Sequence, residues 1–187
     1  MDKYSAFVER SAVLIAYNRH MRKSFFSFCI LLACAGSSAR AIEQQEQDSW
    51  CWAACIQDAL SQAGLDVPQA DIVARLTGWV SDRPAQVSEV RDILLSYHFR
   101  AREIDRPASP QELYSALMSG WKVIAFVKPT NGPTGHFIML EGIEPQYGGI
   151  MVADPWTGQT QPFTLNSLYY GWRWYGSVVV GRPLGIR

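Results

Sequence analysis

A cysteine, a histidine and an aspartate occupy positions along the sequence that suit a thiol nucleophile and its general base. Cys51 stands where the first helix beyond an N-terminal apolar segment is expected to begin. The free N–H groups and the dipole of a helix N-terminus favour an anion, so a thiol there is shifted toward the thiolate. A lone cysteine is more often a buried structural residue. Its sequence context makes Cys51 the candidate nucleophile.

The general base follows by elimination, because the chain beyond residue 41 contains only His98 and His136. His98 ends an amphipathic segment, which is typical of a surface histidine. His136 follows a glycine-containing turn and opens an apolar strand, which places its ring at the edge of a sheet. Asp154 ends the next predicted strand, so its carboxylate is expected to hold the His136 ring in one tautomer.

These residues and their neighbours resemble the papain-like cysteine peptidases. The resemblance rests on Gln45, the motif Trp50-Cys51-Trp52-Ala53-Ala54, His136 and the motif Asp154-Pro155-Trp156. It is closest to bacterial branches that process bacteriocin leaders or act as plant-pathogen effector proteases. It scarcely extends to residues 64–120.

The resemblance implies further roles around the nucleophile. Gln45 is expected to donate its side-chain amide to the oxyanion, beside the backbone N–H of the nucleophile, and Gln44 and Gln47 are the alternatives. Trp52 and Trp156 are candidates for the substrate cleft. Trp156 is expected to shield the His–Asp pair, with core packing as the alternative. No metal and no cofactor are expected.

The elements that position these residues are predicted as helices first and strands second. The expected fold class is α+β and papain-like, with the nucleophile at the start of a central helix in a helical N-terminal half. This half packs on a C-terminal antiparallel sheet. A capping box at Ser109 marks the last helix clearly. Helices are expected over 51–63, 68–76, 87–97 and 110–120, and strands over 121–127, 136–143, 148–154, 158–165 and 176–181.

The first 41 residues are predicted to be an N-terminal extension and signal peptide. Residues 21–41 have a basic start, a short apolar run and a small-residue end, which is the form of a secretory signal. Residues 1–20 lack this form, which favours Met21 as the true start. Cleavage after Ala41 would leave a single peptidase domain over residues 42–187. One alternative is a lipoprotein box that would leave Cys34 lipidated, and the other is a buried first helix.

Charge and motif content exclude several functional classes. The whole chain has a formal net charge of +0, and removal of the basic N-terminal segment would leave a mildly acidic protein without a nucleic-acid-binding face. The spacings required for a zinc, phosphate-loop or dinucleotide site are missing from the sequence. Cys51 and Cys55 lie four residues apart on one predicted helix, where disulfide geometry is unfavourable.

The predicted function is therefore a cysteine peptidase that hydrolyses peptide bonds through a Cys51 thioester, secreted or periplasmic, acting on a protein or peptide substrate. One alternative is an amidase or acyltransferase of the same fold that acts on a non-protein amide. Another is a catalytically idle secreted binding module. Membrane association is expected only if Cys34 is lipidated, and the sequence does not determine the oligomeric state.

Overall fold

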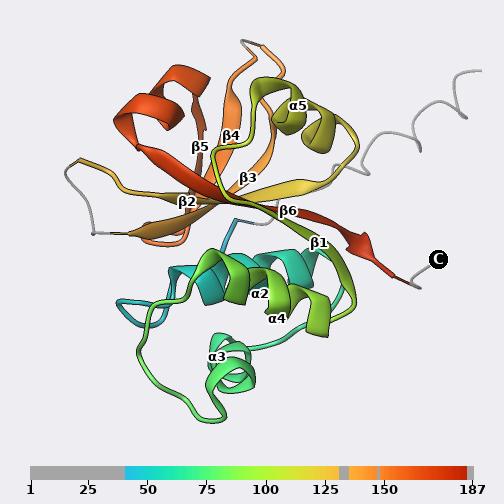
Figure 1. Cartoon of the computed structure of the whole chain (residues 1–187), viewed down its shortest axis with the longest axis vertical. Coiled ribbons are helices and arrows are strands. Elements are labelled where there is room, and N and C mark those ends of the chain that lie inside the picture. The colour runs from blue at the N-terminus through green and yellow to red at the C-terminus, as the bar shows by residue number, and fades with distance from the viewer. Residues whose placement is uncertain (1–40, 131–134, 147, 185–187) are drawn as a thin grey trace, which may run out of the picture. The chain divides into compact units, whose positions relative to one another are not determined.

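A six-stranded antiparallel sheet with helices on both faces forms the core of the fold. The computed structural model describes residues 41–130, 135–146 and 148–184. The elements are helices α2 (Cys51–Gln62), α3 (Gln69–Thr77), α4 (Val87–Ser96) and α5 (Pro110–Met118), the short π-helix η1 (Ser167–Gly171), and strands β1 (Phe99–Ile104), β2 (Lys122–Val127), β3 (His136–Ile143), β4 (Ile150–Asp154), β5 (Gln159–Phe163) and β6 (Trp174–Pro183). The strand order is β1-β6-β2-β3-β4-β5. Figure 1 shows α2, α3 and α4 on one side of the sheet and α5 on the other.

Alternation along the central strands divides the buried side chains into two cores. In β2, Ile124 packs with the helices α2, α3 and α4, whereas Val123 packs on the α5 side. In β3, Phe137 and Ile138 are divided in the same way. Because both faces of the sheet are covered, these strands are almost continuous apolar runs, as expected for fully buried strands.

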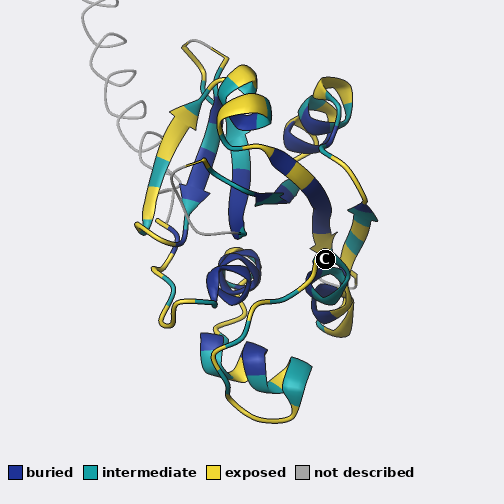
Figure 2. Cartoon of the chain, turned by 60° about the vertical axis from the view of Figure 1, so that its left-hand side comes forward, coloured by how far each residue is buried: buried dark blue, intermediate teal, exposed yellow. Residues whose placement is uncertain are grey.

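The central helix of the fold is α2, which is enclosed by α3, α4 and β3. Residues 51–60 of α2 are all buried, and Figure 2 shows one helix that is dark blue over nearly its whole length. A helix that is buried on all sides is typical of an interior position, and here the buried residues include the polar Gln57 and Asp58. It begins at Cys51 without a side-chain cap from Trp50. The N–H groups of its first turn are therefore left without a capping side chain at the site described below.

One strand of the sheet, β1, was not predicted from the sequence. β1 lies between α4 and α5 and pairs with β6, from Phe99↔Pro183 to Ile104↔Ser177. The turn between α4 and β1 is made by His98, which has a positive φ of 62°. The glycine that usually marks such a turn is therefore missing from the sequence. The partner strand lies far along the sequence, so local patterns did not reveal the pairing. The π-helix η1 was missed as well.

The remaining predicted helices and strands are confirmed with small changes at their ends. The capping box is present at α5, where the Glu112 N–H donates to Ser109 Oγ at 3.3 Å and the Ser109 N–H donates to Glu112 Oε2 at 2.8 Å. Among the described residues, no helix is both long enough and apolar enough to cross a membrane. Residues 1–40, with Cys34 and nearly all of the predicted signal segment, lie outside the described part of the chain.

Candidate active site

The candidate nucleophile lies at the first position of α2, next to the start of β3. Cys51 is 7% exposed. Its Sγ atom accepts a hydrogen bond from the backbone N–H of Phe137 at 3.4 Å. A helix N-terminus and a backbone donor both favour negative charge on sulfur. Cys51 Sγ therefore lies at a helix N-terminus with a backbone donor beside it.

The candidate base and its orienting carboxylate meet at one end of the sheet. His136 opens β3 and Asp154 ends β4, and the two strands are antiparallel neighbours. His136 Nε2 and Asp154 Oδ1 are 2.6 Å apart. The backbone N–H of Trp156 donates to the same oxygen at 2.9 Å. The contact between neighbouring strands that was expected from the sequence is present, and the carboxylate is held by two donors.

The surroundings of His136 favour its charged form. Burial lowers the pKa of the ring, but hydrogen bonds to Asp154 and Cys51 raise it, and the balance raises the pKa of His136 to about 9. Because Nε2 faces Asp154, Nδ1 is the ring nitrogen that faces the thiol. The three side chains therefore form a line that runs from Cys51 Sγ through the His136 ring to the Asp154 carboxyl group.

The side chain of Gln45 does not face the sulfur in this structure. Its Nε2 donates to the backbone carbonyls of Gln47 and Asp48, each at 2.8 Å. Its Oε1 is buried and accepts no hydrogen bond within the described residues. The amide therefore braces the turn that leads into α2, and its predicted role as an oxyanion donor stays a prediction. The alternative Gln44 donates through Nε2 to the carbonyl of Trp156 at 2.9 Å.

A hollow of about 270 Å³ opens at the candidate catalytic pair. Cys51 and His136 line it together with the apolar side chains of Trp52, Phe126 and Phe137. This composition, a few polar groups within an apolar wall, is typical of small-molecule and peptide-side-chain sites. The hollow is large enough for one or two side chains of a peptide.

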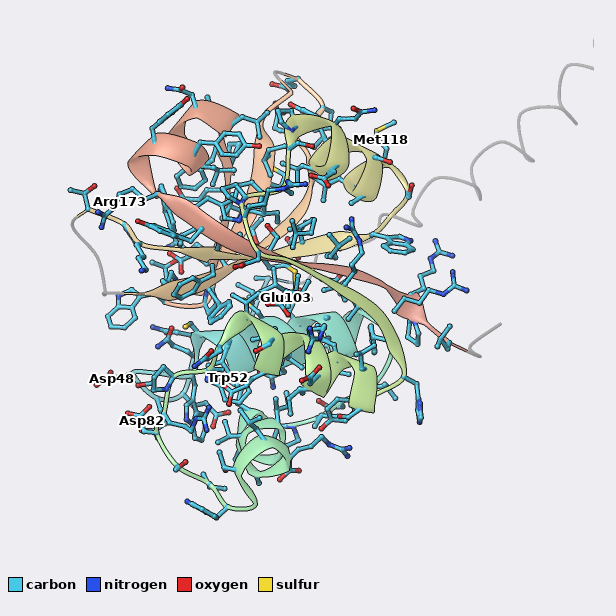
Figure 3. All side chains as sticks on the ribbon, in the orientation of Figure 1. Asp48, Trp52, Asp82, Glu103, Met118 and Arg173 are labelled. Carbon is cyan, nitrogen blue, oxygen red and sulfur yellow. The ribbon has the colours of Figure 1, made fainter. Side chains whose placement is uncertain are left out.

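A second hollow of about 310 Å³ adjoins the first and is more polar. It is lined by residues 44–48 and Trp156, and Asp48 lines both hollows. Figure 3 shows Asp48 and Asp82 close together at the same end of the helical layer as Trp52.

The two tryptophans predicted for the cleft have different positions. Trp52 is 0% exposed, and its indole N–H donates to the carbonyl of Arg83 at 3.1 Å, so it forms a fixed wall of the first hollow. Trp156 is 48% exposed and is one of the residues that line the second hollow. Its link to the His–Asp pair runs through its backbone N–H.

Two features of the site were missed in the sequence. One is the Phe137 N–H, which contacts the sulfur only because β3 runs past the start of α2. The other is Gly135, where a Cβ atom would lie 2.8 Å from Phe126 Cζ. Gly135 therefore gives the Phe126 ring its space beside the hollow. Its position directly before His136 was the available signal.

The other histidine and the other cysteine of the described residues, His98 and Cys55, are not part of this arrangement. His98 is exposed. Cys51 and Cys55 are both free thiols, and burial, followed by the proximity of Cys51, raises the pKa of the Cys55 thiol. Within the described ranges, no group of three His, Cys, Asp or Glu side chains is arranged to hold a metal ion. Cys51 therefore stays the candidate nucleophile of the two thiols.

Comparison with solved structures identifies the fold. A protein from Bacillus anthracis described as a C39-like peptidase superposes with a TM-score of 0.61 at 15% sequence identity, over 79% of this chain and 97% of that protein. The fold is that of the C39-like peptidases. The peptidase domain of Streptococcus ComA, a bi-functional ABC transporter involved in a quorum-sensing pathway, has a TM-score of 0.59 at 11% identity, over 76% of this chain and 98% of the domain.

The sequence itself shows no comparable match, because no protein-family model and no curated protein matches it. At such low identities the structural likeness concerns the fold alone. The predicted α+β papain-like fold class is confirmed. Similarity to effector proteases and the roles of individual residues stay predictions.

Proposed function

We propose that this chain is a cysteine peptidase that hydrolyses peptide bonds through a thioester on Cys51. The observation that carries the proposal is the 2.6 Å contact between His136 and Asp154, with the other ring nitrogen facing a sulfur at the N-terminus of α2. The C39-like peptidase fold supports it. A catalytically idle binding module would have no need for Cys51, His136 and Asp154 to lie in one line beside an open hollow.

In the first half of the reaction, Cys51 Sγ attacks the carbonyl carbon of the scissile peptide bond. The carbonyl oxygen becomes an oxyanion, which accepts hydrogen bonds from the backbone N–H of Cys51 and from Gln45. Because the Gln45 amide donates to two carbonyls in this structure, this step includes a rotation of its side chain. The C–N bond then breaks, and the leaving amine takes the proton from His136 Nδ1.

In the second half, water hydrolyses the thioester. His136 Nδ1 accepts a proton from the water as its oxygen attacks the thioester carbonyl. The C–S bond breaks, so that the carboxylic acid product leaves and the Cys51 thiolate returns beside a protonated His136. Asp154 keeps the ring in place through both steps by its hydrogen bond to Nε2.

The first test is the reactivity of Cys51 toward iodoacetamide across pH 4 to 9, measured on the full chain by peptide mapping. We expect selective alkylation of Cys51 at acidic to neutral pH. In His136→Ala, the pH at which alkylation sets in should move up toward the pKa of an ordinary thiol, ~8.5. Cys55 serves as the internal control. Alkylation that is slow, indifferent to His136 or equal at Cys55 would leave only the binding-module alternative.

The second test separates a peptidase from an amidase. Purified chain and Cys51→Ser are incubated in parallel with a proteome digest and with peptidoglycan fragments, and products are identified by mass spectrometry. We expect new peptide termini only with the unmodified chain. Turnover of the cell-wall fragments alone would replace the peptidase by an amidase of the same fold.

We also propose that the enzyme acts outside the bacterial cytoplasm, since residues 21–41 have the form of a secretory signal. The expected mature N-terminus is Ile42, and the expected partner is a peptide or protein substrate. N-terminal sequencing of the protein recovered from a bacterial envelope or medium tests this. A lipidated Cys34 at the N-terminus would indicate anchoring instead, and an intact Met1 would contradict export.

A further inference from the structure

Gln69 is a fully buried polar residue outside the candidate catalytic line. Its side chain is 0% exposed, although it belongs to α3 and not to the helix that carries Cys51. A buried amide is costly unless its donors and acceptor are all used. Gln69 donates two hydrogen bonds through Nε2 and accepts one through Oε1. The hydrogen bonds at this position therefore require an amide side chain.

The Gln69 amide holds the backbone on both sides of Gln45. Its Nε2 donates to the carbonyl of Gln44 at 3.0 Å, and its Oε1 accepts from the N–H of Glu46 at 3.0 Å. The same Nε2 also donates a hydrogen bond to Gln57 Oε1 on α2 at 2.9 Å. A single side chain therefore ties the arm of residues 44–46 to the helix that begins with Cys51.

The other edge of this arm is held by the turn that follows Asp154. The Gln45 N–H donates to the carbonyl of Pro155 at 2.9 Å. In an extended chain, the carbonyl of one residue and the N–H two residues on face one edge, while the residue between them faces the other. Gln69 thus occupies the place of a neighbouring strand, opposite the Pro155 carbonyl. The backbone of Gln45 is fixed from both edges.

We propose that Gln69 is a positioning residue of the active site, which sets the place of Gln45 relative to Cys51 by holding the backbone at Gln44 and Glu46. This inference rests on the proposed function. A side chain that must rotate toward an oxyanion can do so reproducibly only if its backbone stays fixed. Without the Gln69 amide, one edge of the arm loses its partners, while the His136–Asp154 contact loses none.

The test uses two reactions that differ in their need for an oxyanion hole. Alkylation of Cys51 by iodoacetamide displaces iodide and forms no oxyanion, so it reports the Cys–His pair alone. Hydrolysis of a peptide substrate and binding of a peptide aldehyde both form a tetrahedral adduct on sulfur, whose former carbonyl oxygen must be accommodated by the oxyanion-hole donors. The variant is Gln69→Met, which keeps the length of the side chain and removes the amide. All measurements use the full chain.

We expect Gln69→Met to lower kcat for peptide hydrolysis by ~10- to 100-fold and to weaken aldehyde binding in parallel, with alkylation of Cys51 unchanged. Val73→Ala is the matched control, because Val73 is also 0% exposed on α3 and makes no side-chain hydrogen bond to the arm. It should lower the melting temperature and leave both reactions near the original rates.

A double variant shows whether Gln69 acts through Gln45. Gln45→Ala alone should lower kcat by ~10²- to 10³-fold, and adding Gln69→Met should cause little further loss, since the arm then has no side chain to position. If the double variant loses as much kcat as the product of the two single losses, the inference is overturned. It is also overturned if Gln69→Met slows the alkylation of Cys51 as much as it slows hydrolysis. If Gln69→Met does not fold, Gln57→Met should show a smaller loss in the same direction, and a rate equal to that of the unmodified chain would overturn the inference.

The outcomes separate this inference from the proposed function. An unmodified chain without selective reactivity at Cys51 would overturn both. An unmodified chain that is alkylated at Cys51 and hydrolyses peptides, with Gln69→Met equal to it in all three reactions, would overturn the positioning role alone.

Discussion

At the scale of single residues, the charge on the His136 ring is expected to make the activity depend on pH. Its pKa is raised to about 9 by hydrogen bonds that outweigh the effect of burial. The charged ring persists below that pH and is lost above it. An enzyme that needs an imidazolium to protonate the leaving amine should therefore lose activity on the alkaline side as His136 releases its proton.

Asp154→Asn should move this alkaline limb to lower pH. Asparagine keeps an oxygen that accepts from Nε2 but carries no charge, so the pKa of His136 falls, and the limb shifts down by roughly one unit or more. The measurement is kcat/KM for a cleaved peptide from pH 5 to 10. His98→Gln, at an exposed histidine, should leave the profile unchanged. An unmoved limb in Asp154→Asn would show that the carboxylate does not set the charge of the ring.

Gly135→Ala should reduce activity by a steric route. The new methyl group would lie 2.8 Å from Phe126 Cζ, so the ring must move within the hollow, and we expect kcat/KM to fall by about 10-fold or more. Gly142→Ala is the matched control, because a Cβ there meets nothing within 4 Å. Adding Phe126→Leu should restore part of the activity. Equal rates for both alanine variants would contradict this role of Gly135.

At the scale of elements, the seam between α2 and β3 carries a second titrating group. Asp58 on α2 is 5% exposed, and Gln62 Nε2 donates to Asp58 Oδ2 at 2.6 Å and to Glu141 Oε1 at 3.1 Å. Burial, and then the Glu141 carboxylate, raise the pKa of Asp58 from 3.8 to about 7. The buried Asp58 carboxyl group and the half-buried Glu141 carboxyl group therefore share one amide donor.

This seam predicts a pH-dependent stability. A carboxyl group whose pKa is raised by folding binds more protons in the folded chain, so the folded state loses stability as pH rises from about 4 to about 7. Asp58→Asn removes this loss and should stabilise the chain above pH 7, relative to pH 4, by on the order of 3 kcal/mol. Denaturant unfolding at pH 4.5 and pH 8 measures it.

The exposed Asp66, which lies just beyond α2, provides the control for this prediction. Asp66→Asn should change stability little at either pH. A difference between Asp58→Asn and the unmodified chain that stays constant with pH would show that Asp58 does not carry a raised pKa in the folded chain.

The sequence revealed those parts of the site and fold that depend on residue type and on local pattern. Cys51, His136 and Asp154 stand at element ends, and the ends follow from helix and strand patterns. The Phe137 donor and the Asp58–Glu141 pair depend on which strand passes α2, and β1 depends on its distant partner β6. No local pattern encodes such pairings, because they arise from the packing of the whole chain.

At the scale of the whole molecule, one sheet is shared by two cores. The core around α2 contains Cys51, and the core around α5 contains Leu113. Each central strand contributes alternate side chains to both. Loss of packing in either core therefore weakens the sheet that holds His136 and Asp154, although only one core touches the nucleophile.

Leu113→Ala tests this division. Leu113 is 0% exposed, and its truncation should lower the free energy of unfolding by about 2–5 kcal/mol. The rate of Cys51 alkylation under native conditions should not change, because Leu113 packs on the opposite face of the sheet. Unfolding followed by fluorescence and by pulsed alkylation should give one coincident transition. Two separate transitions would show that the cores unfold independently.

The hydrogen bond from the main chain at position 137 has a consequence for inheritance. The group that contacts Cys51 Sγ is a backbone N–H, and every amino acid except proline supplies one. Codon changes at this position can therefore alter the wall of the hollow while the donor to sulfur is retained. Lineages of such a protein could diverge in the side chains they accept without losing that contact to the nucleophile.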